Sequence, residues 1–203
     1  ESFYRFNLDP SDKIVAQFHE WMTGTGLLYL KSANVPIATV FTTHATVIGR
    51  CIAGNNLPLY DGILSYNADE KARQFNVVAR HSLEKKAAQN SDIFTTVSEI
   101  TAQECRQFLG RPVDVVTPNG FEPSFTPATD EEYIVLRDKA RQRLVTVASA
   151  MCGEEVPENA VLVGIGGRYE WKNKGIDVFI DALAKLNHTE FKGKSVHAFI
   201  MIP

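Results

Sequence analysis

Two cations flank a glycine-containing turn near the end of the chain, in the segment 166–175 (GGRYEWKNKG). Arg168 and Lys174 are six positions apart, so both side chains can reach one anionic group. Gly167 and the glycine before it let the backbone turn tightly and approach a ligand closely. A helix-length stretch follows, and its positive N-terminal end would add to the two cations. The pattern is typical of a diphosphate site that needs no metal. A solvated basic turn in which Arg168 pairs with Glu170 is equally supported.

A second candidate is the segment 42–50 (TTHATVIGR), which follows the apolar run 37–41. His44, next to Thr43, stands where a strand would end and could donate a hydrogen bond to a sugar hydroxyl. Arg50 comes six positions later, which is far enough along a helix to aim it at a phosphate. The alternative for this segment is a helix-capping threonine beside a histidine at the edge of the core. From the residues alone, that alternative is favoured.

Other polar residues also come directly after apolar runs, at His19, Ser98 and Asn119. In open parallel sheets, ligands bind at the carboxyl ends of the strands, so these positions are candidates as well. His19-Glu20-Trp21 has no second histidine four residues on, which excludes a zinc-protease helix. A buried histidine bonded to a glutamate or to the backbone is the favoured interpretation of His19. Ser98 is also a good N-cap for a helix over 99–109.

These candidates need a framework of strands and helices to position them. Short apolar runs, mostly β-branched and not cleanly alternating, predict strands covered on both faces at 14–18, 37–41, 93–97, 113–116, 161–165 and 196–202. Helix-length segments lie between them at 20–32, 68–90, 99–109, 131–150 and 175–186. Strands alternating with helices predict an α/β fold with parallel sheets.

The domain organisation follows from turn signals and composition. Residues 117–120 (TPNG) predict a turn, and a proline-containing, acidic stretch comes next. We therefore expect a first α/β domain over 1–120, a linking helical segment over 121–158, and the start of a second α/β domain over 159–203. The start at Glu1 and an apolar run close to the end predict an internal piece of a longer protein.

Composition narrows the class of protein. The 203 residues include 21 Lys and Arg against 24 Asp and Glu without a basic cluster, so we expect no nucleic-acid partner. An apolar run of about 18 residues, the length of a membrane span, is absent. Cys51, Cys105 and Cys152 are roughly fifty positions apart, which suits neither a disulfide framework nor a zinc site. Reduced thiols in a cytoplasmic protein are the expectation.

Five ordered motifs make the sequence familiar. It resembles the animal and fungal type of glycogen synthase at FHEW (18–21), FTTHATVIGR (41–50), FTTVS (94–98), TPNG (117–120) and GRYEWKNKGID (167–177). AFIMIP (198–203) is similar to the strand that follows in that family. The resemblance implies a GT-B glycosyltransferase with two Rossmann-like domains facing a cleft, and a piece that spans their junction.

The resemblance also implies chemistry. Glucose would pass from a nucleotide-glucose donor, UDP-glucose rather than ADP-glucose, to the 4-hydroxyl end of an α-1,4-glucan with retention. His44, Arg168 and Lys174 would be catalytic, the two cations stabilising the leaving diphosphate in place of a metal. The same resemblance implies substrate-binding positions at Arg50, Thr43, His19, Asn119 and Gly167. No cofactor or metal is implied, and the whole protein would be a homo-oligomer.

Some parts of the family pattern are missing. The glycine-rich loop of the first domain, the late Glu-Pro motif with its essential carboxylate and the arginine cluster for glucose-6-phosphate all lie outside these residues. The stretch 130–143 contains no histidine, where eukaryotic members use one to read that effector, so this region resembles a bacterial member. We expect the 203 residues alone to be inactive. The alternatives are another GT-B transferase, an inactive glucan- or nucleotide-binding module, and a remnant that only oligomerises through a helix over 68–90.

Overall fold

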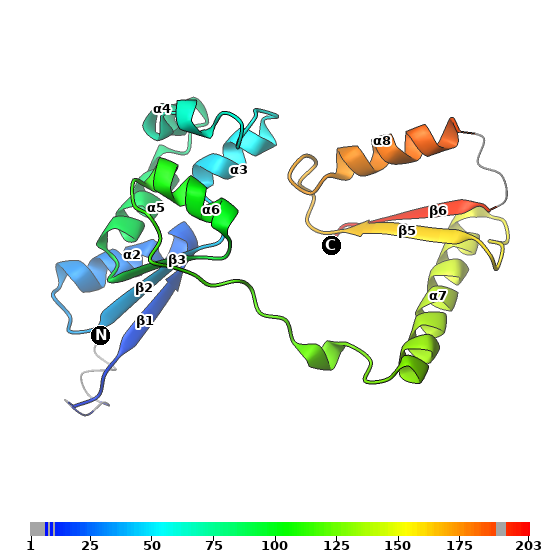
Figure 1. The fold of residues 1–203 in the computed structure, drawn as a ribbon, viewed down its shortest axis with the longest axis horizontal. Helices are drawn as coiled ribbons and strands as arrows, with labels where there is room; N and C mark the ends of the chain where they lie inside the picture. The colour runs from blue at the N-terminus through cyan, green and yellow to red at the C-terminus, as the bar shows by residue number, and fades with distance from the viewer. Residues whose placement is uncertain (1–6, 8, 10, 190–193) are drawn as a thin grey trace. The chain divides into compact units, whose positions relative to one another are not determined.

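The computed structural model describes residues 7, 9, 11–189 and 194–203, so the Glu1-Ser2-Phe3 start lies outside the described residues. The chain divides into two compact units, Glu1–Asn119 and Gly120–Pro203 (Figure 1). Each unit holds its own parallel sheet, as an α/β fold requires. The fold class predicted from the sequence is confirmed.

The first unit is built on a four-stranded parallel sheet. Its strands, in spatial order, are β1 (Val15–His19), β2 (Ala38–Thr43), β3 (Ile93–Thr96) and β4 (Val115–Val116). Residue His19 pairs with Thr42, and Thr43 pairs with Thr96. This register brings the carboxyl ends of β1, β2 and β3 to one edge of the sheet, where their following residues gather.

Helices connect the strands of this unit. They are α2 (Glu20–Ser32), α3 (Val47–Gly54), α4 (Ala68–Gln74), α5 (Val78–Asn90) and α6 (Glu99–Glu104), with a short 3₁₀ turn at Ile63–Ser65. A second 3₁₀ turn, Pro123–Phe125, lies at the start of the second unit. The expected helix over 20–32 is confirmed. The stretch 68–90 is two helices rather than one, because Asn76 takes a left-handed conformation (φ 55°) between them. Both lie within the first unit, and α5 packs on α2.

The expected helix over 99–109 is present but changes its winding. Ser98 caps α6 by accepting a hydrogen bond from the backbone N–H of Thr101 at 3.1 Å. The last turn, η2 (Cys105–Leu109), is π-helical. It ends at Gly110, whose left-handed φ of 69° suits a glycine. The predicted start and end of this helix are therefore confirmed.

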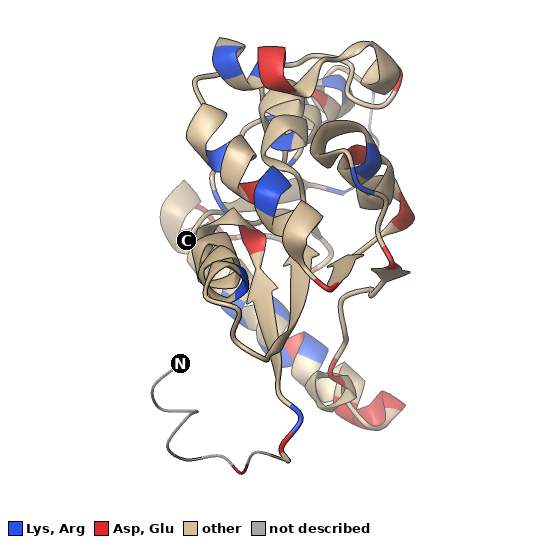
Figure 2. Cartoon of the chain, turned by 90° about the vertical axis from the view of Figure 1, so that its left-hand side faces the viewer, with Lys and Arg blue, Asp and Glu red and all other residues tan. Residues whose placement is uncertain are grey.

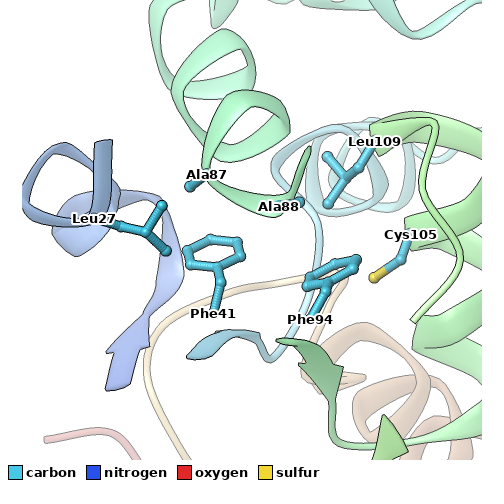
Figure 3. Close-up of a cluster of buried hydrophobic side chains, with 7 residues drawn as sticks. All are labelled: Leu27, Phe41, Ala87, Ala88, Phe94, Cys105 and Leu109. Carbon is cyan, nitrogen blue, oxygen red and sulfur yellow. The ribbon is translucent and has the colours of Figure 1, made fainter. Parts of the chain in front are cut away.

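The core of the first unit lies between the sheet and its helices. Phe41 of β2 and Phe94 of β3 stack with ring centroids 5.9 Å apart, and Leu27, Ala87, Ala88, Cys105 and Leu109 close around them (Figure 3). The strands were expected to be covered on both faces. That holds for the buried ends of β2 and β3, whereas Val15 on the edge strand β1 is 63% exposed. Edge position explains the difference, since in the part of the chain that the structure describes β1 pairs with β2 alone.

The second unit combines a long helix with a β-α-β element. Its parts are α7 (Asp130–Cys152), β5 (Val161–Gly166), α8 (Ile176–Asn187) and β6 (Val196–Met201), and β5 pairs with β6 in parallel. A small core joins α7 to the sheet through Ala148, Val156, Ala160, Val145 and Phe199. Contacts therefore group α7 with the second unit. The separate linking role expected for 121–158 stays a prediction.

Charge is distributed rather than clustered. Figure 2 shows basic and acidic positions interspersed over the helices of the first unit. Within the described part of the chain, no helix is long and apolar enough to cross a membrane. The three cysteines are all free, with Cys105 buried and Cys152 exposed.

Candidate functional site

Two histidines meet at the carboxyl edge of the first sheet. Nδ1 of His19, the last residue of β1, lies 3.0 Å from Nε2 of His44, which follows β2. The parallel register produces this meeting, because β1 and β2 end side by side. His19 is exposed and His44 is half-buried. The favoured interpretation of His19 as a buried histidine is wrong, since His19 is exposed at the carboxyl end of β1.

Glu20 completes this group and carries backbone strain. Its φ is 64°, a left-handed conformation that a non-glycine residue adopts at a cost of about 1–3 kcal/mol. The conformation turns the chain sharply from β1 into α2. A carboxylate oxygen of Glu20 then accepts a hydrogen bond from the backbone N–H of His44 at 2.8 Å. Glu20 thereby fixes the backbone of His44, a role that the sequence did not reveal.

A buried carboxylate holds the residue before His44. The hydroxyl of Thr43 donates to Oε1 of Glu84 at 3.0 Å, and the N–H of Val47 donates to Oε2 at 3.0 Å. Thr43 and Glu84 are fully buried. Burial raises the pKa of the Glu84 carboxyl to about 7, although the hydrogen bonds from Val47 and Thr43 lower it. The Thr43 hydroxyl is thus bonded to a buried carboxylate, and its expected contact with substrate stays a prediction.

A second buried carboxylate lies behind α3. The hydroxyl of Thr46 donates to Oε2 of Glu104 at 2.7 Å, and the hydroxyl of Tyr60 donates to Oε1 at 2.9 Å. Thr46 also caps α3 by accepting from the N–H of Gly49 at 2.9 Å. Gly49 is required here, because a Cβ at this position would collide with the Glu104 carboxylate. The helix-capping threonine predicted from the sequence is confirmed.

Three further candidates lie on the same unit. Arg50 is exposed on α3 and forms no ion pair with any residue that the structure describes. Ser98 is occupied as the cap of α6. Asn119 is exposed in the segment that follows β4. The structure therefore brings His19 and His44 together, while Arg50 and Asn119 remain available to a ligand.

The turn of the second unit has the glycine geometry that the sequence indicates. Gly167 has a φ of 153°, which side-chain-bearing residues rarely adopt. A Cβ there would lie 3.6 Å from Cδ of Lys174, so the aliphatic stem of Lys174 packs over this glycine. Arg168 pairs with Glu170 at 2.9 Å and remains 68% exposed. Among the described residues, Lys174 has no ion-pair partner.

The turn does not enclose a ligand by itself. The hollow lined by Gly167, Arg168 and Lys174 has a volume of about 10 Å³, which is room for about one water molecule. The neighbouring Lys172 is bound to Asp177 at 2.7 Å, which anchors the start of α8. The two cations of interest therefore line an open surface. No group of three or more His, Cys, Asp or Glu side chains in the described ranges is arranged to hold a metal ion.

Comparison with known proteins identifies the family. A family model described as glycogen synthase matches residues 2–203. The chain belongs to the glycogen synthase family. It is similar to glycogen [starch] synthase of Dictyostelium discoideum, with 38% identity over 96% of this chain and 23% of that protein. Isoform 2 of Saccharomyces cerevisiae is 37% identical over 97% of this chain and 29% of that protein. The liver form of Homo sapiens is 37% identical over 94% of this chain and 28% of that protein.

The chain thus spans about a quarter of the length of these relatives. The α/β fold with parallel sheets is that of a Rossmann-like glycosyltransferase, as the resemblance implies. The identity does not assign roles to single side chains, so the site residues named above stay predictions.

Sequence reasoning missed Glu84 and Glu104. Each lies in a helical segment rich in charged residues, which is usually a solvated surface. The adjacent Ala87 and Ala88, both buried, mark the inner face of α5 and place Glu84 on that face. That pattern could have indicated a buried carboxylate, but it could not have named its partners, which are 37 and 41 positions away.

Proposed function

We propose that this chain is part of a glycogen synthase that transfers glucose from a nucleotide-glucose donor to the non-reducing 4-hydroxyl end of an α-1,4-glucan, with retention. Family membership carries the proposal. The histidine pair of the first unit and the cationic turn of the second unit support it, because sugar and diphosphate need groups of these two kinds.

The cationic turn would receive the diphosphate of the donor. Arg168 offers a planar pair of donors and Lys174 a compact charge, and Arg50 is a further proposed phosphate-binding residue. To bind the phosphate, Arg168 must break its ion pair with Glu170. Breaking it costs little, because ion pairs between exposed side chains contribute about 0–1 kcal/mol. As the bond from sugar to phosphate breaks, negative charge grows on the leaving diphosphate and the fixed cations stabilise it.

The His19–His44 pair at the carboxyl ends of β1 and β2 would bind the glucose. His44 would donate a hydrogen bond to the sugar, near the carbon that gains positive character. His19 would fix the ring of His44 through their 3.0 Å contact, and Glu20 would fix its backbone. Asn119 and Thr43 complete the proposed set on the first unit, and Gly167 provides the close backbone approach on the second. We propose that no metal and no further cofactor takes part.

The remaining features of the whole protein are proposals on the same basis. We infer that UDP-glucose is preferred to ADP-glucose, as the resemblance implies. We infer a cytoplasmic homo-oligomer with nucleotide sugar and α-glucan as its partners and without a nucleic-acid partner.

Donor turnover by the full-length protein tests the proposal. Radiolabelled UDP-glucose and ADP-glucose are offered separately with a glucan primer, to the wild type and to Arg168→Ala. Label is expected in glucan from UDP-glucose, and the variant is expected to lose roughly a hundredfold or more in kcat, the effect of removing one stabilising donor. Lys172→Ala is the matched control, since Lys172 is a cation of the same turn that is occupied by Asp177.

Two results would overturn parts of this proposal. Transfer from neither donor, in a folded full-length protein, would favour a binding module or a transferase with another acceptor. Glucosyl transfer by the isolated 203 residues would contradict the view that half of the donor site lies beyond them.

A further inference from the structure

Two carboxylates are buried in the first unit without a cation beside them. Glu84 of α5 is fully buried and Glu104 of α6 is 4% exposed. Neither forms an ion pair with any residue in the described ranges. Burying a charged carboxylate is costly unless it is compensated, so such residues almost always have a partner. Here the compensation comes only from hydrogen-bond donors.

Those donors come mainly from one short segment. Glu84 accepts from the hydroxyl of Thr43 and from the N–H of Val47, each at 3.0 Å. Glu104 accepts from the hydroxyl of Thr46 at 2.7 Å, and its other bond comes from Tyr60. Residues 43–47 therefore donate three of these four hydrogen bonds. The two carboxylates hold that segment from α5 and α6.

The segment 43–47 contains His44 and the first residue of α3, the helix on which Arg50 lies. His44 lies between two residues held by Glu84, namely Thr43 and Val47. Gly49 packs against the Glu104 carboxylate so closely that a methyl group there would collide with it. Displacing Glu84 therefore removes contacts on both sides of His44, and displacing Glu104 removes a contact of the first turn of α3.

We propose that Glu84 and Glu104 are positioning residues that hold the segment 43–50 in the geometry with which His44 and Arg50 meet the donor. The inference rests on the proposed function for what the segment binds. It adds two residues that lie behind the sheet edge and do not touch the donor.

The chemistry of the carboxylate explains why an amide would not serve equally well. Each carboxylate receives two donors on its two oxygens. Glutamine has one acceptor oxygen and an NH₂ group with two hydrogens. At Glu84 the amide oxygen would accept from the Val47 N–H and the NH₂ would donate one hydrogen to the Thr43 hydroxyl, which must reverse its own donation. The second hydrogen of the NH₂ enters a buried site in which the carboxylate had only accepted, and both bonds lose the assistance of the carboxylate charge. Glu→Gln therefore loosens the segment with almost no change in side-chain volume.

The test uses Glu84→Gln and Glu104→Gln in the full-length protein. Glu99→Gln is the matched control, because Glu99 is an exposed carboxylate on the same helix as Glu104. Steady-state kinetics with UDP-glucose and a glucan primer give KM for each substrate. Hydrogen–deuterium exchange of the segment 43–50 gives its order independently of activity, with the segment 24–30 of α2 as the internal reference.

We expect a split between the two substrates. Each variant lowers kcat/KM for UDP-glucose by roughly tenfold to a hundredfold, as small misplacements of binding groups do. KM for the glucan stays within twofold. Exchange in 43–50 speeds up at least tenfold, and exchange in 24–30 does not change. A general loss of stability would instead affect both segments and both substrates.

Opposite outcomes are equally clear. Folded variants with wild-type kinetics for UDP-glucose overturn the proposal, and so does faster exchange in 43–50 without a kinetic effect. If the variants do not fold, hydrogen–deuterium exchange of the wild type without UDP-glucose tests the proposal. Slow exchange of the Val47 and Gly49 amides supports it, and fast exchange refutes it. A wild-type protein that transfers no glucose refutes the proposed function, whereas an active wild type with unaffected variants refutes this inference alone.

Discussion

Replacing Glu84 by glutamine should change the free energy of unfolding in opposite directions at low and high pH. Burial raises the pKa of Glu84 from 4.5 to about 7, and nearby Glu20 and Glu104 raise it further, against the hydrogen bonds from Val47 and Thr43. Between these pH values the folded state keeps a proton that the unfolded state has released. The stability contributed by this residue therefore falls as the pH rises from 4.5 to 7.

The structure sets the size of the effect. One pH unit of pKa difference corresponds to about 1.4 kcal/mol, so ionised Glu84 costs roughly 3 kcal/mol above pH 7. Solvent does not screen this cost, because the side chain is fully buried. Glutamine cannot ionise, but it leaves one donor unpaired, at a cost of about 1–3 kcal/mol. We expect Glu84→Gln to be roughly 1 kcal/mol less stable than wild type at pH 5 and roughly 1 kcal/mol more stable at pH 8.

Urea unfolding of the full-length protein from pH 5 to pH 8, followed by circular dichroism, measures this crossover. The informative quantity is the difference between variant and wild type, because other titrating groups contribute equally to both. Glu99→Gln serves as the exposed control and should show no crossover. A difference for Glu84→Gln that stays constant across this pH range would refute the reasoning that a buried carboxylate titrates near neutrality.

Three further predictions concern other parts of the chain. The Lys31 ammonium, with Thr39, lowers the pKa of Asp92 to about 2, so its stabilisation is present above pH 4 and is lost as the pH falls through 2. After discounting for solvent screening, Asp92→Asn should cost roughly 1 kcal/mol at pH 7 and progressively less as the pH falls through 2 in urea titrations. Gly49→Ala should cost about 1–3 kcal/mol through its collision with Glu104, and an unchanged Tm would contradict this. Gly167→Ala should raise KM for UDP-glucose roughly tenfold, because it disturbs the turn that carries both cations; unaltered donor kinetics would argue against that turn as the diphosphate site.

Local signals determined most of the fold. The helix over 20–32 was predicted with its observed bounds, and Ser98 and Gly110 marked the two ends of the helical segment 99–109. The break at Asn76 was not predicted, because a single asparagine within a charged stretch is a weak signal. The exposure of Val15 was not predicted either, since it depends on which strand lies at the edge of the sheet.

The site was predictable where its chemistry is local. The turn around Arg168 and Lys174 is visible from glycines and cations within ten residues, and both sequence interpretations of it have support, since Arg168 does pair with Glu170. The contact between His19 and His44 depends on the pairing of two strands 25 positions apart. Glu84 and Glu104 depend on helix packing over still longer separations, and no short motif encodes that.

Departures from ordinary folding preferences gather at one edge of the first sheet. Glu20 accepts a left-handed backbone there, Glu84 keeps a carboxylate without a cation, and Gly49 leaves no space for a side chain. The first two features lower stability on their own, and all three act on the segment that carries His44. Strain and buried charge of this kind persist where the surrounding structure uses them to fix a site. A glycine at 20 would relieve the backbone strain, and a glutamine at 84 would remove the cost of the buried charge above pH 7. Their coincidence around His44 supports, independently of family membership, the proposal that this edge of the sheet binds the substrate.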